Sequence, residues 1–403
     1  MNQLRVYLFA VILTASINTL SLGSEPDKSV VGPWDVDHLL DTPVQATWGK
    51  KQGLVQEVYY DSEPLAGKPT RVFAYYARPK GNGPHPAILL VHGGGGKAFS
   101  EWAAQWAKRG YAALAMDTTG NGPGGVPLVD GGPSQAVGVF RAFTDREARE
   151  MWTYHAVAAV LRGHALLAGQ PEVDRSRIGI TGISWGGYLT CIVAGIDHRL
   201  RVAVPVYGCG YLADNSAWSD TGEFKKLSDD DRQRWIENFD PASYLPAAKC
   251  PMLFVNGTND FAYPLDSYQK SYRLVKSPVV LCVTVNMPHG HKEGWNPKEI
   301  GAFVDSQLIE AAPLVQIGAS SINGAEVVAE FKGSPLAKSE LHYTSDTGKW
   351  QDRKWTSKPA RIRATEHRIV AELPSDRPLT LFFTITDERG LTVSNPHILI
   401  DKD

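Results

Sequence analysis

The sequence predicts an α/β protein with a doubly wound, mostly parallel sheet, followed by a small β-sandwich. From about residue 54, apolar runs of strand length alternate with segments of helical length, as in repeated βαβ units. Several of these runs are apolar throughout, as expected for parallel strands buried on both faces. After Pro313 the helical segments stop and only short alternating runs remain.

The elements expected in the first domain follow in chain order. VQEVYY and RVFAYYARP alternate in polarity and predict two edge strands, and PAILLVHG predicts the first buried parallel strand. The strands are expected at 55–60, 71–79, 86–93, 111–119, 177–184, 201–208, 251–260 and 278–286. The helices are expected at 99–110, 185–196, around 267–275 and at 296–308. Thr144 and Glu147 form a possible capping box, which predicts one more helix from there to about Leu167.

The chain is therefore divided into an α/β domain over residues 24–312 and a β-sandwich domain over residues 313–403. Two stretches, 118–143 and 209–245, interrupt the first domain at strand ends, and we expect them to form walls or lids of a site. Strands of the second domain are expected in ELHYT, RIVAEL, LTLFFTIT and LTVSNPHILI. Nothing in the second domain resembles a catalytic cluster, and we expect it to be separable from the chemistry.

Residues 1–23 have the pattern of a secretory signal peptide. Arg5 precedes an apolar run of ten residues, VYLFAVILTA, and small residues stand at Ser21 and Gly23. This run is too short to span a membrane, which needs about 20 residues. We therefore expect a secreted or periplasmic protein.

Composition excludes several classes of protein. Hydrophobic residues make up 43% and charged residues 21% of the 403 residues, which is ordinary for a globular protein with a sizeable core. The formal net charge of −2 gives no basic surface for nucleic acid. The four cysteines are too few for a disulfide scaffold, and their spacing does not suggest a zinc site. Cysteine pairing and oligomeric state cannot be deduced from the sequence.

The stretch GISWGGY at 182–188 provides the strongest functional signal. It follows the strand IGITGI, precedes a helix and matches G-x-S-x-G at Gly182, Ser184 and Gly186. Such a strand–turn–helix elbow needs glycines beside a tight turn and leaves the serine oxygen exposed above the sheet. We predict that Ser184 is a nucleophile and that the backbone N–H of Trp185 serves the oxyanion hole.

A nucleophilic serine needs a base that is held by an acid, and in α/β-hydrolases these follow in the order Ser, Asp, His. Asp260 comes after a strand, 260 − 184 = 76 residues from the serine, with Asp266 as the alternative acid. His289 and His291 follow the last strand of the domain. Both histidines remain candidates for the base, and the preceding Gly290 favours His291.

The glycines of HGGGG at 92–96 follow an earlier strand and let backbone approach an oxygen closely. They are therefore candidates for the rest of the oxyanion hole.

On these residues the chain resembles the acetyl xylan esterase and dienelactone hydrolase-like group of α/β-hydrolases, which is related to prolyl oligopeptidase catalytic domains. The resemblance covers about residues 50–310 and rests on LLVHGGGG, VDRSRIGITGISWGGY, FDPASYL, PMLFVNGTNDFAYP and PHGHKEGW. It implies a triad of Ser184, Asp260 and a histidine of PHGH, with Gly94 and Trp185 in the oxyanion hole. The chain departs from acetyl xylan esterases in having HGGGGKAF and DTTGNG, where those enzymes have a tyrosine and an Arg-Gly-Gln stretch.

These features favour a secreted serine carboxylesterase that acts on a small-molecule or polysaccharide ester, with acetylated carbohydrate as the expected substrate. The chemistry requires no metal and no organic cofactor. A prolyl oligopeptidase-type peptidase and a non-catalytic carbohydrate-binding protein are the alternatives. Four aromatic residues near strand-end loops are candidates for stacking on a sugar ring: Trp102, Trp185, Tyr263 and Trp295.

Overall fold

A parallel sheet forms the centre of the protein, as the sequence predicts. The computed structural model describes residues 32–401 except residues 137 and 334, so the signal peptide expected at residues 1–23 lies outside the described residues. The parallel strands, in spatial order, are β5 (Ala112–Met116), β4 (His85–Val91), β6 (Val173–Ile183), β7 (Val202–Val206), β8 (Met252–Gly257) and β9 (Val279–Thr284). Most of their residues are buried, with exceptions at the start of β6 and at both ends of β9, and this burial explains their apolar runs.

Three antiparallel strands extend the sheet beyond β5. They are β1 (Ala46–Gln52), β2 (Val55–Leu65) and β3 (Lys68–Ala77). The strands predicted at 55–60 and 71–79 correspond to β2 and β3, but neither lies at the edge, because β1 pairs with β2 and β3 pairs with β5. The sequence did not reveal β1, because its residues are mostly exposed and lack an alternating pattern.

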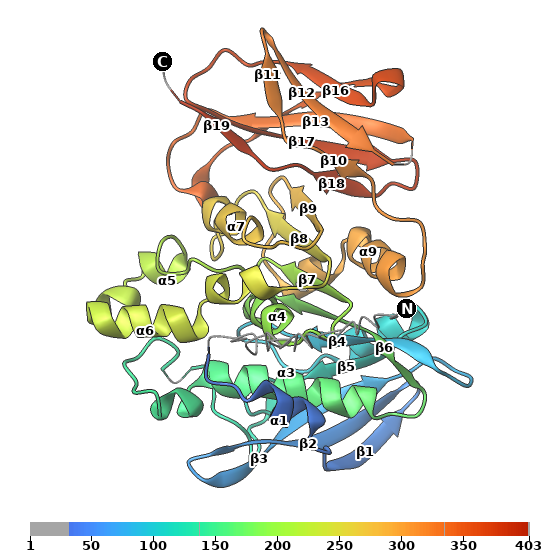
Figure 1. The fold of residues 1–403 in the computed structure, drawn as a ribbon, viewed down its shortest axis with the longest axis vertical. Helices are drawn as coiled ribbons and strands as arrows, with labels where there is room; N and C mark the ends of the chain where they lie inside the picture. The colour runs from blue at the N-terminus through green and yellow to red at the C-terminus, as the bar shows by residue number, and fades with distance from the viewer. Residues whose placement is uncertain (1–31, 137, 334, 402–403) are drawn as a thin grey trace, which may run out of the picture. The chain divides into compact units, whose positions relative to one another are not determined.

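Helices cover both faces of the sheet. On one face α3 (Trp152–Ala168) contacts α4 (Trp185–Ile196), and Figure 1 shows α3 in front of the central strands. Two further helices, α2 (Ser100–Lys108) and α9 (Lys298–Leu308), are linked by an ion pair. Arg109, just after α2, pairs with Asp305 of α9 at 2.6 Å.

The helix expected from Thr144 to Leu167 begins later than predicted. Thr144 and Glu147 do form the expected capping box. The capping box starts only a short 3-10 helix, Glu147–Glu150. This helix ends there because Met151 is extended, with φ −78° and ψ 145°. The long helix α3 therefore starts at Trp152.

The strands of the C-terminal region form two layers. One layer continues the central sheet through β18 (Thr392–Ser394), which pairs with β9 and is followed by β17 (Leu379–Asp387), β13 (Leu336–Thr344) and β14 (Thr356–Pro359). The other layer is made of β10 (Gln316–Ile317), β11 (Ser321–Asn323), β12 (Glu326–Lys332), β15 (Arg361–Arg363) and β16 (Arg368–Glu372).

The four predicted C-terminal strand segments are all found, in β13, β16, β17 and the pair β18 and β19 (Ile398–Ile400). The sequence missed β12 and the shorter strands. It also did not anticipate that Ser394 of β18 pairs with Leu281 of β9, which joins the C-terminal strands to the central sheet. The domain boundary near residue 313 therefore stays a prediction.

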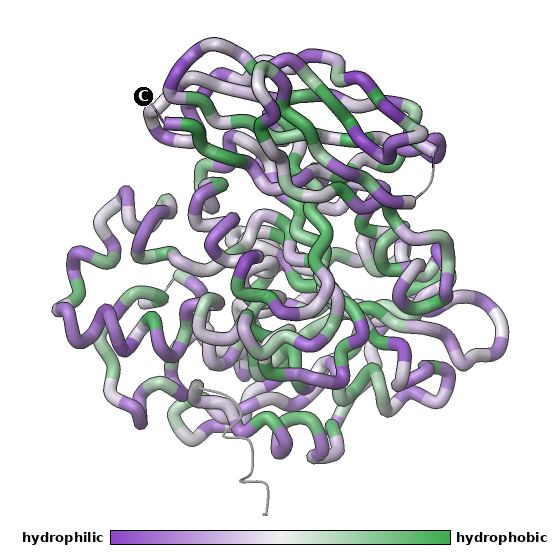
Figure 2. The backbone as a smooth tube through the Cα atoms, turned by 45° about the horizontal axis from the view of Figure 1, so that its top comes forward, coloured by the Kyte–Doolittle hydropathy of each residue, from purple (hydrophilic) through white to green (hydrophobic). Residues whose placement is uncertain are grey.

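Hydrophobic segments concentrate in the interior strands, and hydrophilic segments dominate the outer loops (Figure 2). No described helix is long and apolar enough to cross a membrane. All four cysteines are free and buried.

Candidate active site

Ser184 occupies a strained turn between β6 and α4. Its backbone has φ 58° and ψ −117°, a conformation that a residue with a side chain adopts only when its surroundings enforce it. The Ser184 N–H donates to Val206 O at 2.9 Å, and Ser184 O accepts from Tyr188 N–H at 2.9 Å. Ser184 is partly exposed whereas its neighbours are buried, so the turn presents its hydroxyl at the carboxyl end of the sheet.

The glycines around Ser184 are required by close backbone contact. A Cβ on Gly186 would lie 2.0 Å from Val91 O of β4, and a Cβ on Gly182 would lie 2.1 Å from Gly186 O. Both distances are far below any real carbon–oxygen contact. The G-x-S-x-G pattern therefore reflects an elbow packed directly against the neighbouring strand, as predicted.

His289 joins Ser184 to Asp260. Its Nε2 lies 2.9 Å from Ser184 Oγ, and its Nδ1 lies 2.6 Å from Asp260 Oδ2. The Asp260 carboxylate is fully buried, and its Oδ1 accepts the N–H groups of Ala262 at 2.9 Å and Tyr263 at 2.7 Å. With Oδ2 accepting a hydrogen bond from Nδ1–H, the lone pair of Nε2 faces the serine hydroxyl.

Two aromatic rings hold His289 in this orientation. The Tyr207 ring stacks on the imidazole with a centroid separation of 4.3 Å, and the Tyr207 hydroxyl donates to Pro288 O at 2.7 Å. The Phe261 ring lies 4.9 Å from the imidazole, and Phe261 is 55% exposed. Tyr207 thus fixes the histidine loop, while Phe261 leaves an apolar surface beside the reacting atoms.

The sequence pattern favours His291 as the base, and the geometry corrects this preference. His291 Nε2 accepts the Gly93 N–H at 2.9 Å, so its lone pair is already used. Burial is the main cause that lowers the pKa of His291 to about 4, and His92 and His289 nearby lower it further. Gly290 has extended backbone at φ −168°, and His291 begins the short helix α8 (His291–Trp295). Gly290 therefore makes no turn that would carry His291 to the serine.

Asp266, the alternative acid, is also placed away from the histidines. It lies in α7 (Leu265–Tyr272), and its two carboxylate oxygens accept from Asn215 Nδ2, each at 2.9 Å. The structure therefore brings together Ser184, Asp260 and His289.

The predicted oxyanion-hole residues lie side by side at the elbow. Trp185 is the first residue of α4, so its N–H has no partner within the helix. A Cβ on Gly94 would lie 2.8 Å from Trp185 Cδ1, which shows how closely the HGGGG loop approaches the elbow. The hydrogen bond from Gly93 N–H to His291 Nε2 ties the HGGGG loop to the start of α8. Gly94 and Trp185 are thus neighbours at the elbow, and their role in an oxyanion hole stays a prediction.

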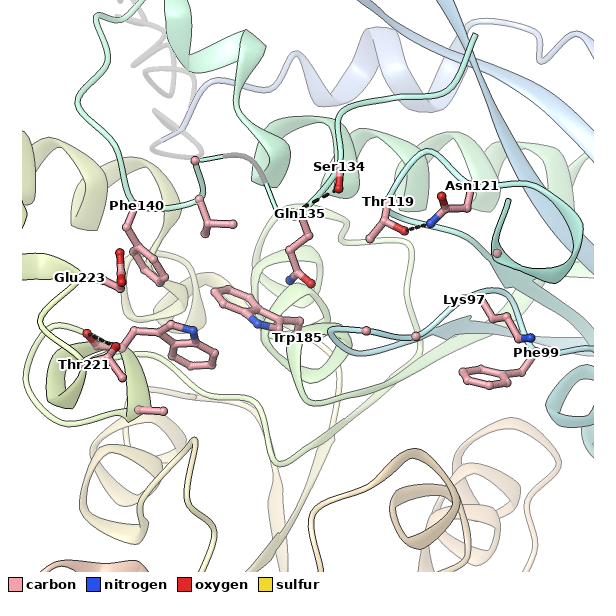
Figure 3. Close-up of a pocket in the computed structure, with 18 of the residues that line it drawn as sticks. Lys97, Phe99, Thr119, Asn121, Ser134, Gln135, Phe140, Trp185, Thr221 and Glu223 are labelled. Atoms are coloured by element: carbon pink, nitrogen blue, oxygen red, sulfur yellow. Dashed lines mark hydrogen bonds between the residues drawn. The ribbon is translucent and has the colours of Figure 1, made fainter. Parts of the chain in front are cut away.

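A cavity of about 1080 Å³ opens beside the elbow and begins at Trp185 and the glycines of the HGGGG loop. Both stretches that interrupt the first domain line it. The first contributes Thr119, Asn121, Ser134, Gln135 and Phe140, and the second contributes Ala217, Trp218, Thr221 and Glu223. Figure 3 shows Trp185 near the centre, with Phe140, Thr221 and Glu223 on one side and Lys97 and Phe99 on the other.

Of the four aromatic residues proposed to stack on sugar, only Trp185 lines this cavity. Trp102 and Tyr263 are buried in the core, and Trp295 packs on Trp102 beside a separate cavity of about 200 Å³. The sequence analysis missed Trp218, whose ring lies 4.4 Å from that of Trp185. It lies in an insertion without a regular hydrophobic pattern, so no periodic signal pointed to it.

Comparisons with known proteins found similar esterases and peptidases. The acetyl xylan esterase (AXE1) family model matches residues 47–243, which include Ser184 but not Asp260 or His289. Acetyl esterase Axe7A of Xylanibacter ruminicola is 23% identical over 270 residues, covering 62% of this chain and 60% of that protein. The uncharacterized peptidase YuxL of Bacillus subtilis is 24% identical, covering 65% of this chain and 37% of that protein. The chain thus spans less than two thirds of either relative.

Solved structures show the same fold. An acetyl xylan esterase from Paenibacillus sp. R4 superposes with a TM-score of 0.54 at 20% identity, covering 68% of this chain and 92% of that one. Acetyl xylan esterase 1 from Thermoanaerobacterium sp. JW/SL YS485 gives a TM-score of 0.51 at 21% identity, with the same coverage. These solved structures share the fold of this chain, and the family model adds a sequence similarity to acetyl xylan esterases over residues 47–243.

Proposed function

We propose that this protein is a carboxylic-ester hydrolase that removes acyl groups from carbohydrate, with Ser184 as nucleophile, His289 as base and Asp260 as acid. The observation that carries the proposal is the position of His289, whose ring nitrogens contact Ser184 Oγ and Asp260 Oδ2 at 2.9 and 2.6 Å. This is the geometry that lets a serine hydroxyl lose its proton as it attacks a carbonyl carbon.

In the acylation half of the proposed reaction, Ser184 Oγ forms a bond to the ester carbonyl carbon while its proton moves to His289 Nε2. The carbonyl oxygen gains negative charge, and the N–H groups of Gly94 and Trp185 stabilise it, each donor being worth roughly 3–4 kcal/mol. Asp260 stabilises the imidazolium through Nδ1. The carbon–oxygen bond to the alcohol then breaks, and the alcohol leaves with the proton from Nε2.

In the second half of the reaction, water attacks the acyl group on Ser184. His289 takes a proton from this water and returns it to Ser184 Oγ as the bond between Oγ and the acyl carbon breaks. The products are a carboxylic acid and the free serine. This chemistry is complete with the side chains present and needs no metal or organic cofactor.

The cavity supports carbohydrate as the alcohol side of the substrate. It is wide and open, with the aromatic rings of Phe140, Trp185 and Trp218 in its wall. Polar side chains of Lys97, Asn121, Gln135, Thr221 and Glu223 complete the lining. Sugars present apolar ring faces and many hydroxyl groups, and a wall of this mixed kind offers partners for both.

Gln135 gives this proposal a specific contact. Its Nε2 is buried and has no hydrogen-bond partner among the described residues, although the side chain lines the cavity. Leaving a buried donor unpaired costs roughly 1–3 kcal/mol. A substrate oxygen in the cavity would satisfy this donor. The side chain also stands beside the HGGGG loop, since Gln135 Oε1 lies 3.1 Å from the point where a Cβ on Gly94 would stand.

The signal-peptide pattern at residues 1–23 extends the proposal to an exported enzyme. An exported enzyme would meet polysaccharide outside the cytoplasm, which fits the proposed substrate.

Replacement of Ser184 by alanine tests the proposed function. We expect ester hydrolysis to fall by roughly 10³-fold or more, because the nucleophile is lost while a small side chain remains at the turn. Rates on p-nitrophenyl acetate, acetylated xylo-oligosaccharide and a peptide anilide should be compared between wild type and a folded Ser184→Ala variant. Wild-type-like ester hydrolysis by that variant would exclude the mechanism. Preference of the wild type for the anilide would indicate a peptidase, and no turnover of any substrate would indicate a binding protein.

The two histidines should differ sharply in their effect on rate. We expect His289→Ala to lower kcat by roughly 10³-fold or more, because both proton transfers use this ring. His291→Ala should cost only about 10-fold, through a looser oxyanion loop. The acid limb of the pH profile of kcat/KM should also stay in place in His291→Ala, because His291 does not take the serine proton. The assignment fails if His291→Ala is the severe variant or if both variants are mild.

Substrate recognition is tested by Gln135→Ala and Trp218→Ala. Each should raise KM for acetylated xylo-oligosaccharide by about 5- to 10-fold, because a contact worth about 1 kcal/mol is lost. The value of kcat/KM on p-nitrophenyl acetate should change less than about threefold, because this ester carries no sugar. Trp48→Ala is the matched control, since Trp48 is an exposed tryptophan on β1, far from β6 in the strand order. Equal effects on both esters would contradict the proposal that Gln135 and Trp218 bind the sugar part of the substrate.

A further inference from the structure

Asn259, the residue before Asp260, links the acid loop to the C-terminal strand region. Its Nδ2 lies 3.4 Å from Trp350 O, 3.0 Å from Gln351 O and 2.7 Å from Arg353 O. All three carbonyl groups belong to one short segment around the 3-10 helix η6 (Trp350–Asp352). The two amide hydrogens match the two shorter contacts, to Gln351 O and Arg353 O, and these fix the amide in both position and orientation.

The segment that receives these hydrogen bonds is itself firmly anchored. Trp350 is 6% exposed and packs with Leu265, Val283 and Phe382, which come from both sides of the predicted domain boundary. The Arg353 guanidinium lies over the Trp350 ring at 3.7 Å. The three carbonyl groups are therefore fixed points rather than parts of a loose loop.

The other end of the Asn259 amide continues the network toward the histidine loop. Asn259 Oδ1 accepts from Thr258 Oγ1 at 2.6 Å, and Thr258 Oγ1 accepts the Asn286 N–H at 3.0 Å. Asn286 stands three residues before His289 and has a positive φ of 55°. One side chain thus connects the C-terminal segment, the loop of Asp260 and the loop of His289.

We propose that Asn259 is a positioning residue, through which the C-terminal strand region holds Asp260 and His289 in register with Ser184. This inference rests on the proposed function, because the position of these two loops affects the rate only if Asp260 and His289 act on Ser184. It also revises the expectation that residues 313–403 are separable from the chemistry. The C-terminal region would supply no reacting group, but it would determine where two of them stand. Displacements of about 1 Å at a reacting group can lower rates by about 100-fold.

Replacing Asn259 in the full-length chain tests the inference. We expect Asn259→Ala to lower kcat on p-nitrophenyl acetate by about 10- to 100-fold, with KM changed less than about twofold, because positioning acts on the chemical step. Asn259→Ser keeps one donor and should give an intermediate loss, and it serves in place of the alanine variant if that variant does not fold. Circular dichroism and thermal unfolding should confirm that each variant is folded at the assay temperature.

Gln269→Ala is the matched control. Gln269 in α7 donates Nε2 to His397 O at 2.8 Å, so it also links the two regions through a side-chain amide and a backbone carbonyl, away from the acid loop. Its kcat should stay within about twofold of wild type.

The inference is overturned if folded Asn259 variants keep wild-type kcat, if they change KM alone, or if Gln269→Ala loses as much rate. Ser184→Ala, measured in parallel, distinguishes a failure of the proposed function from a failure of the positioning role of Asn259. If that variant remains active the proposed function itself fails, whereas an inactive Ser184→Ala beside fully active Asn259 variants overturns only the positioning role.

Discussion

The arrangement of the site depends on one strained turn. Ser184 holds a positive φ because the chain on both sides of it packs against neighbouring backbone, with Gly182 against Gly186 O and Gly186 against Val91 O. The unfavourable conformation, which costs on the order of 1–3 kcal/mol, is maintained by that packing. Its consequence is that the Ser184 hydroxyl stands at the carboxyl end of β6, to which the loops after β4, β8 and β9 bring the remaining groups.

These loops are held by interactions that take no part in the chemistry. The Gly93 N–H donates to His291, Tyr207 stacks on His289, and the Asp260 carboxylate accepts two backbone N–H groups. Asn259 adds a contact with a segment about 90 residues further along the chain. A site that needs reacting groups to be placed within fractions of an ångström is thus supported by a second layer of hydrogen bonds and ring contacts.

The sequence predicts the fold and most of the triad because these signals are local. Buried parallel strands are apolar along their whole length, and both Ser184 and Asp260 stand directly at strand ends, where such groups converge. The choice between His289 and His291 could not be read in this way, since it depends on the path of a loop in which Gly290 is extended. Gln135 and Trp218 lie in insertions without periodicity, and the contacts of Asn259 depend on tertiary packing of distant segments.

The central claim is that His289 activates Ser184, and covalent labelling by a fluorophosphonate tests it most directly. This reagent forms a stable phosphorus–oxygen bond with an activated serine hydroxyl and releases fluoride, so the modified residue can be located by peptide mass spectrometry. The account predicts a single label on Ser184 in the wild type and its loss in a folded His289→Ala variant. A label on another serine, or undiminished labelling of Ser184 without His289, would contradict it.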